Sequence, residues 1–175
     1  MQVNVENPMT IAWAYRAMMA CGATRDYTPL DLYRARHSVI YAVQFWVDIA
    51  GISDRAHTHL VRSHVGFTPW VASQRPDRGG VPGLRSMSVL CNAEALIILA
   101  QKRLCQRAFA ETRAIVLAIR DGVRVIDPDL AAVMQPRCVW DSGCRQGGCG
   151  WYAGQCLPGD AGCYAPFITP HGGDA

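Results

Sequence analysis

Apolar residues occupy every second position between residues 39 and 49, at Val39, Tyr41, Val43, Phe45, Val47 and Ile49. Because successive side chains of a strand point to opposite faces, this spacing predicts a long strand with one buried face. Gly51 ends the run, and Ser53 is placed to cap a helix from Asp54 to about His64. The chain is therefore expected to contain a sheet whose longest strand is followed directly by a helix.

Caps and breakers predict two more helices. Residues 7–22 read as an amphipathic helix that begins after Asn7-Pro8 and closes near Gly22. Thr28 is placed to cap a second helix, with Pro29 and Asp31 in its first turn.

Further along, residues 67–74 indicate a short strand, and Pro69 favours the edge of the sheet for it. Glycine and proline make residues 75–85 a loop. We expect the main helix over residues 88–120, stopped by Asp121-Gly122, and a last short helix from Asp127-Pro128 to about Pro136.

Half of the 175 residues are hydrophobic, enough for one domain with a real core. We therefore expect an α+β fold over residues 1–136, with long helices packed on a small sheet, followed by a Cys/Gly-rich C-terminal tail over 137–175. The tryptophans and Met19 are expected in the core.

Charge and hydropathy exclude some classes of protein. The longest apolar stretch, Ala95 to Ala100, is too short to cross a membrane, and no basic region followed by an apolar run opens the chain. A cytoplasmic protein is expected, in which the eight cysteines are reduced thiols or metal ligands rather than disulfides. The net charge of +3 is mild and makes nucleic acid an unexpected partner.

Arginine dominates the basic residues, since Lys102 is the only lysine. Arginine forks bind phosphate and carboxylate in a bidentate way, although a genome that prefers arginine codons explains the bias equally well. Asn92 and Arg103 would lie on one face of the expected long helix, about 16 Å apart along its axis. That span suits a nucleotide lying across the helix, and the alternative is a solvated face of paired charges.

Three ordered motifs are similar to those of flavin-dependent thymidylate synthases. The long-helix signature of that family resembles Asn92-x10-Arg103-x4-Ala108-x2-Glu111-x-Arg113. Upstream, the stretch from Phe45 through Ser53 to His59-Leu60-Val61-Arg62 looks like the approach to the family's Arg-His-Arg motif, and Ser73-Gln74-Arg75 looks like its Ser-x-Arg end. The resemblance covers about residues 40 to 120.

The resemblance implies a role for each matching position. Arg62, His64 and Asn92 would contact FAD, with Ser63 as an inserted residue. Ser73 and Arg75 would hold the phosphate of a dUMP-type nucleotide, helped by Arg85 (or Arg78). Arg103 would orient the pyrimidine and act as the catalytic residue, by favouring negative charge on the ring.

The resemblance also implies partners and a reaction. Methylene-tetrahydrofolate would supply the carbon added at C5 of the base, NADPH would reduce the flavin, and a homotetramer would share active sites between subunits. The product would carry a methyl or a hydroxymethyl group. The short chain also fits a viral member, which would act in the host cytoplasm.

The chain departs from the family pattern at several positions. Val65 stands where the second arginine of Arg-His-Arg is expected, and Glu94 where relatives often carry arginine. These differences keep a second hypothesis open, a nucleotide-binding or structural homologue without catalysis. A metal-stabilised nucleic-acid module is a third.

Cysteines recur through the tail and could hold zinc or an iron–sulfur cluster; the candidate ligands are Cys138, Cys144, Cys149 and Cys156. Free thiols, or disulfides formed after purification, are the alternatives. His57, His59 and His64 are expected to form a polar helix face at the flavin rather than a metal site.

Overall fold

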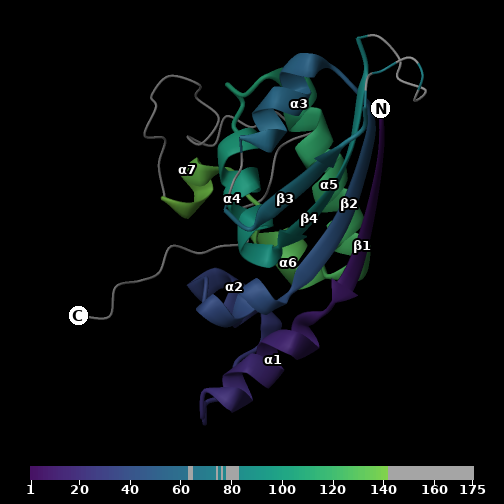
Figure 1. The fold of residues 1–175 in the computed structure, drawn as a ribbon. Coiled ribbons are helices and arrows are strands. Elements are labelled where there is room, and N and C mark those ends of the chain that lie inside the picture. The colour runs from purple at the N-terminus through teal and green to yellow at the C-terminus, as the bar shows by residue number, and fades with distance from the viewer. Residues whose placement is uncertain (63–64, 74, 76, 78–82, 142–175) are drawn as a thin grey trace.

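A single antiparallel sheet organises the computed structural model, which describes residues 1–62, 65–73, 75, 77 and 83–141 (Figure 1). The strand order is β1-β2-β4-β3, and the strands are β1 (Gln2–Met9), β2 (Gln44–Ile52), β3 (Phe67–Val71) and β4 (Arg85–Asn92). The helices are α1 (Ile11–Ala20), α2 (Pro29–Ala35), the 3-10 helix η1 (Ser38–Ala42), α3 (Asp54–Val61), α4 (Ala93–Arg103), α5 (Ala110–Ile126), α6 (Pro128–Val133) and α7 (Arg137–Trp140).

Helices cover one face of the sheet, and α1 and α2 lie beyond its lower end (Figure 1). Phe45, Val47 and Ile49 of β2 are buried on the covered face. On β4 the alternation is the same, with Met87, Val89 and Cys91 buried and the residues between them more exposed. One face of the sheet therefore forms the core, and the other carries the alternate side chains toward solvent.

Several predicted elements are confirmed. Thr28 and Asp31 form a reciprocal capping box at the start of α2, and Ser53 caps α3 by accepting a hydrogen bond from the backbone NH of Ala56. Strand β3 pairs only with β4 among the described strands, so Pro69 does lie on an edge strand. The first helix and the short helix after Asp127 are also present, as α1 and α6.

The prediction of one helix over residues 88–120 is wrong. Its first part belongs to β4, whose alternating burial has a period of two, and α4 begins only after Asn92. Helix α4 ends at Arg103, and α5 starts at Ala110 and continues through Gly122. Gly122 does not end the helix because it serves packing: a Cβ atom there would lie 2.7 Å from Cγ2 of Val5, so glycine lets α5 approach β1.

Three smaller expectations are also corrected. Residues 38–42 form η1 rather than the start of a strand, with the consecutive residues Val39 and Ile40 both buried. Strand β1 was not predicted. Trp13, Trp70 and Met19 are 43%, 49% and 79% exposed rather than in the core. Within the described part of the chain, no helix is long and apolar enough to cross a membrane.

Candidate functional site

Asn92 is held in a tight turn where β4 meets α4. Its Oδ1 accepts a hydrogen bond from the backbone NH of Ala95 at 2.8 Å and caps α4. Its backbone NH donates to the carbonyl of Gly66 at 3.0 Å. Gly66 has φ +66°, and a Cβ atom on it would lie 2.4 Å from Nδ2 of Asn92. Glycine is therefore required beside Asn92. The Nδ2 group of Asn92 could still donate a hydrogen bond to a ligand.

Arg103 ends α4 and reaches α3. Its guanidinium donates to the backbone carbonyl of His59 at 2.9 Å. Its Nε is buried and has no hydrogen-bond partner among the described residues. Burial, followed by the charge of Arg62, lowers the pKa of Arg103. A buried donor without a partner is costly, so this atom is suited to receive an anionic or carbonyl ligand.

Three arginines, Arg55, Arg62 and Arg103, surround His59, and we call this set the arginine cluster. Burial lowers the pKa of His59 from its ordinary value of 6.5, and the charges of Arg103, Arg55 and Arg62 lower it further. The neutral imidazole is therefore the favoured form in the folded protein. The positive potential that disfavours a proton on His59 would favour a bound phosphate or carboxylate.

Contacts between α3 and α5 hold the arginine cluster in place. The carboxylate of Glu111 accepts hydrogen bonds from the backbone NH of Ser53, at 2.8 Å, and from the Ser53 hydroxyl. His59 Nδ1 lies 3.0 Å from the hydroxyl of Thr112, and the Arg55 guanidinium lies 4.4 Å from the ring centre of Phe109. Glu111, part of the long-helix motif, thus anchors the start of α3.

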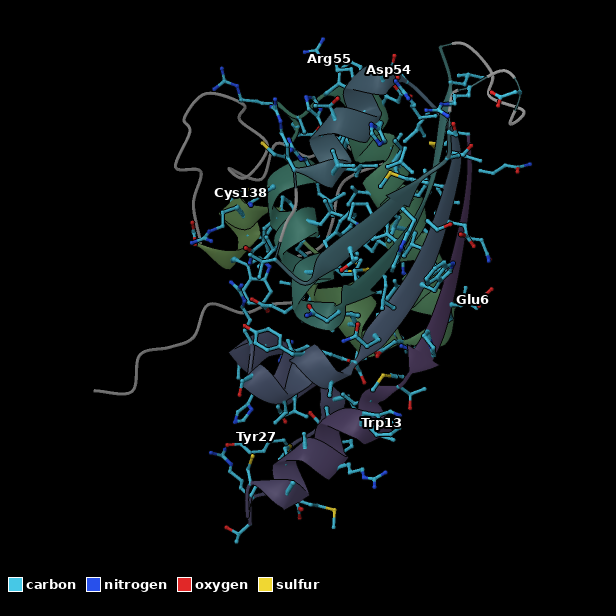
Figure 2. The ribbon with its side chains drawn as sticks, in the orientation of Figure 1. Glu6, Trp13, Tyr27, Asp54, Arg55 and Cys138 are labelled. Carbon is cyan, nitrogen blue, oxygen red and sulfur yellow. The ribbon has the colours of Figure 1, made fainter. Side chains whose placement is uncertain are left out.

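The predicted phosphate-binding residues lie beyond the other end of β3. Ser73 and Arg75 are exposed, and the Ser73 hydroxyl accepts a hydrogen bond from the backbone NH of Arg75 at 3.2 Å. Arg85, the first residue of β4, forms an ion pair with Asp54 at the start of α3 (Figure 2). A phosphate would have to compete with Asp54 for Arg85, whereas Ser73 and Arg75 are open to it.

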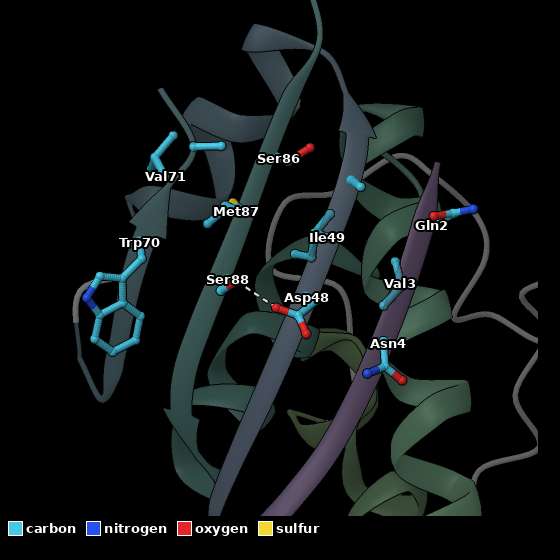
Figure 3. Close-up of a pocket in the computed structure, with 12 residues that line it drawn as sticks. Gln2, Val3, Asn4, Asp48, Ile49, Trp70, Val71, Ser86, Met87 and Ser88 are labelled. Carbon is cyan, nitrogen blue, oxygen red and sulfur yellow. Dashed lines mark hydrogen bonds between the residues drawn. The ribbon is translucent and has the colours of Figure 1, made fainter. Parts of the chain in front are cut away.

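The candidate residues form three separate groups in one chain. Asn92 and Arg103 lie at opposite ends of α4, about 16 Å apart from the rise per residue. Arg85 and Asn92 lie at opposite ends of β4, about 23 Å apart. Arg62 lies with Arg103. Ser73 and Arg75 lie beside Arg85, because the backbone NH of Ala72 donates to the carbonyl of Ser86 at 2.9 Å. A hollow of about 500 Å³ on the open sheet face includes none of these residues (Figure 3).

The remaining candidates lie mostly outside the described residues. This applies to His64 and to three of the four tail cysteines, Cys144, Cys149 and Cys156. Cys138 is on α7, at a distance from α3 (Figure 2). Within the described part of the chain, no three His, Cys, Asp or Glu side chains come close enough to hold a metal.

Sequence reasoning missed Arg55 and the position of His59. Residues 55, 59 and 62 are spaced i, i+4, i+7, which places all three on one face of α3. That spacing is visible in the sequence once the helix is placed, whereas the contribution of Arg103 from α4 depends on tertiary packing.

The lowered pKa of His59 predicts a pH dependence of stability. The unfolded chain binds a proton on this imidazole more readily than the folded protein, so the contribution of His59 is complete above about pH 6.5 and is lost as the pH falls below it. Urea unfolding between about pH 8 and about pH 5 should show a smaller loss of unfolding free energy for His59→Gln than for the original chain. Equal losses in the two proteins would contradict the assignment.

Structural comparison identifies the class of fold. No family model and no curated protein matches the sequence. A crystal structure of flavin-dependent thymidylate synthase ThyX from Helicobacter pylori with FAD and dUMP superposes with a TM-score of 0.62 at 14% identity, covering 77% of this chain and 100% of that one. A second ThyX structure from the same organism, also with FAD and dUMP, gives a TM-score of 0.57 at 15% identity, covering 74% and 99%. The chain has the fold of these ThyX proteins.

Proposed function

We propose that this protein is a flavin-dependent enzyme that transfers a one-carbon unit to C5 of a pyrimidine deoxynucleotide, converting dUMP to dTMP or to a hydroxymethyl product. The observation that carries the proposal is the buried Nε of Arg103, which lies near Arg62 and has no hydrogen-bond partner among the described residues. This cationic site lies in a fold whose solved examples hold FAD and dUMP.

The residues present fit the anionic part of FAD. Arg62 is exposed at the end of α3 and contributes positive charge to the arginine cluster. Asn92 has Nδ2 available for a carbonyl acceptor. Arg62, His64 and Asn92 are therefore our candidates for holding the cofactor, which when bound would carry the reducing equivalents for the reaction.

The nucleotide would be held by a second set of side chains. Ser73 and Arg75 offer a hydroxyl and a guanidinium for the phosphate, which suits a dianion. Arg85 would join them only if its pairing with Asp54 is released. Arg103 would stabilise negative charge as it develops on the pyrimidine, an electrostatic role.

The spacing of the three groups supports an active site shared between subunits. Within one chain, Asn92 and the Ser73–Arg75 pair are at opposite ends of the sheet. A neighbouring copy could supply the complementary group, and we propose a homotetramer. Methylene-tetrahydrofolate as the carbon donor and NADPH as the reductant complete the proposal.

The absorption spectrum of the purified chain tests cofactor binding. A flavin band in the protein as purified, or saturable binding when FAD is added, is expected. A protein that neither carries flavin nor shows a thermal shift with FAD would rule the proposal out. The mass of the nucleotide product distinguishes a methyl from a hydroxymethyl group.

Restoring an arginine at residue 65 should strengthen FAD binding. Val65 is 69% exposed, directly before the Gly66 turn, so a longer side chain has room. A charge-assisted hydrogen bond contributes about 1.5 to 3 kcal/mol, so Val65→Arg should lower the Kd for FAD by about tenfold or more, measured by flavin fluorescence. Val125→Arg, on α5 at an 87% exposed position, is the matched control. If both variants change the Kd equally, general charge rather than the position is responsible.

A further inference from the structure

The open face of the sheet carries a hollow that the proposed reaction does not use. Its floor is made of small side chains on neighbouring strands, Ala50 of β2 with Ser86 and Ser88 of β4 (Figure 3). Because these side chains are short, the space above the strands is unfilled, and the hollow has a volume of about 500 Å³. That volume is in the range of small-molecule sites.

Trp70 forms an aromatic wall of this hollow. Its ring is 49% exposed and stacks on Trp46, with ring centroids 5.3 Å apart and planes 24° from parallel. The two rings restrain each other, so the wall is preorganised. Large aromatic side chains on an open sheet face offer stacking area to a planar ligand.

Asp48 supplies the charge near the middle of the hollow, on β2, which lies between β1 and β4. Its Oδ1 accepts hydrogen bonds from Trp46 Nε1 at 3.0 Å and from the Ser88 hydroxyl at 2.6 Å. Both donors bind the same oxygen, which fixes the carboxylate and leaves Oδ2 as an acceptor. Among the described residues that line the hollow, Asp48 carries the only charged side chain.

The strand register sets the distance between Trp70 and the Asp48 carboxylate. Asp48 and Trp70 are both paired with Ser88, one from each neighbouring strand. Two strand spacings put their Cα atoms about 10 Å apart, so one planar ring system can lie between the two side chains.

We propose that this hollow binds a neutral or cationic planar heteroaromatic ring that carries amino N–H donors, of the aminopyrimidine type. The ring lies against Trp70 and donates to Asp48. A phosphorylated ligand is disfavoured, because it would bring negative charge beside Asp48 with no arginine, lysine or histidine among the described lining residues. The charge of this hollow is therefore opposite to that of the arginine cluster.

Calorimetric titration of the full chain with 2,4-diaminopyrimidine, and with uracil as a ring of similar size without amino donors, tests the proposal. Saturable binding of diaminopyrimidine and much weaker binding of uracil are expected. Asp48→Asn keeps the shape of the side chain and should weaken diaminopyrimidine binding by about tenfold or more. Glu6→Gln removes a charge from β1 outside the hollow and should leave binding unchanged.

Ser86→Leu provides a second test that leaves the carboxylate in place. Ser86 is exposed, so leucine should fill the floor and block the ring without disturbing the core. Absence of saturable binding, equal binding of uracil, or an unchanged Kd in both Asp48→Asn and Ser86→Leu would overturn the proposal. So would sedimentation showing self-association that Trp70→Leu abolishes, because a second copy would then cover this face.

Discussion

Replacing Arg103 with alanine is expected to lower kcat for one-carbon transfer by about 10²- to 10³-fold, the usual effect of removing one preorganised donor to developing charge. The guanidinium has a buried Nε without a described partner, so a donor is already in place before the ligand arrives. The free energy of unfolding should fall by only about 1 kcal/mol, because the alanine variant removes one hydrogen bond to the carbonyl of His59.

Steady-state kinetics of Arg103→Ala, Arg103→Lys and the surface control Arg124→Ala separate this role from a structural one. Lysine keeps the charge but not the fork and should recover only part of the rate. Arg124 pairs with Asp121 on α5, and Arg124→Ala should leave kcat unchanged. Because Arg103 lowers the pKa of His59, its removal should also raise that pKa in an NMR titration. A full kcat in Arg103→Ala would show that Arg103 takes no part in the reaction.

Replacing Glu94 with glutamine is expected to destabilise the protein by about 2 kcal/mol. Glu94 is 5% exposed and accepts from Nε of Arg36 at 3.0 and 3.1 Å through its two carboxylate oxygens. Breaking a fully buried ion pair costs about 3 to 5 kcal/mol, and we expect less here because the Arg36 side chain is 32% exposed. Arg36 also ends α2 in a left-handed backbone conformation, with its backbone NH donating to the carbonyl of Tyr33 at 3.2 Å.

Thermal unfolding measures this effect, with an expected fall in Tm of roughly 4 to 8 °C for 2 kcal/mol in a chain of this size. Arg124→Gln, which loses only the exposed pair with Asp121, should change stability by about 0.5 kcal/mol or less. The charge-swapped protein with Arg36→Glu and Glu94→Arg should recover part of the loss seen in Glu94→Arg alone. A Glu94→Gln variant as stable as the original chain would show that the pair contributes nothing net.

Local signals predicted the elements whose ends are set by neighbouring residues. Thr28 with Asp31, Ser53 and Asp127 each cap the helix that the sequence indicated. Residues 88–92 were misread as helix because their apolar residues suit either period, and the strand assignment depends on pairing with β2. Glu6 and Asn7 gave no strand signal in β1, which forms because β2 provides its hydrogen-bond partner.

The motifs name candidate residues, and the fold decides how these residues lie relative to one another. The motifs singled out Arg62 and Arg103, and both lie near His59, whose backbone carbonyl accepts a hydrogen bond from Arg103. The sequence contained no indication that Asp54 pairs with Arg85, because these residues are 31 positions apart and meet only through the fold. The same holds for Arg36 and Glu94, which are 58 positions apart and also pair only through the fold.

Label transfer is the most direct test of the function proposed for Arg62 and Arg103, which lie at the C-terminal ends of α3 and α4. The purified chain would be incubated with dUMP, FAD, NADPH and methylene-tetrahydrofolate labelled in its one-carbon unit. We predict label in the nucleotide, dependent on FAD and lost in Arg103→Ala. If the protein binds flavin and dUMP but transfers no label, it does not catalyse the reaction. Nucleotide binding without catalysis would then be its function.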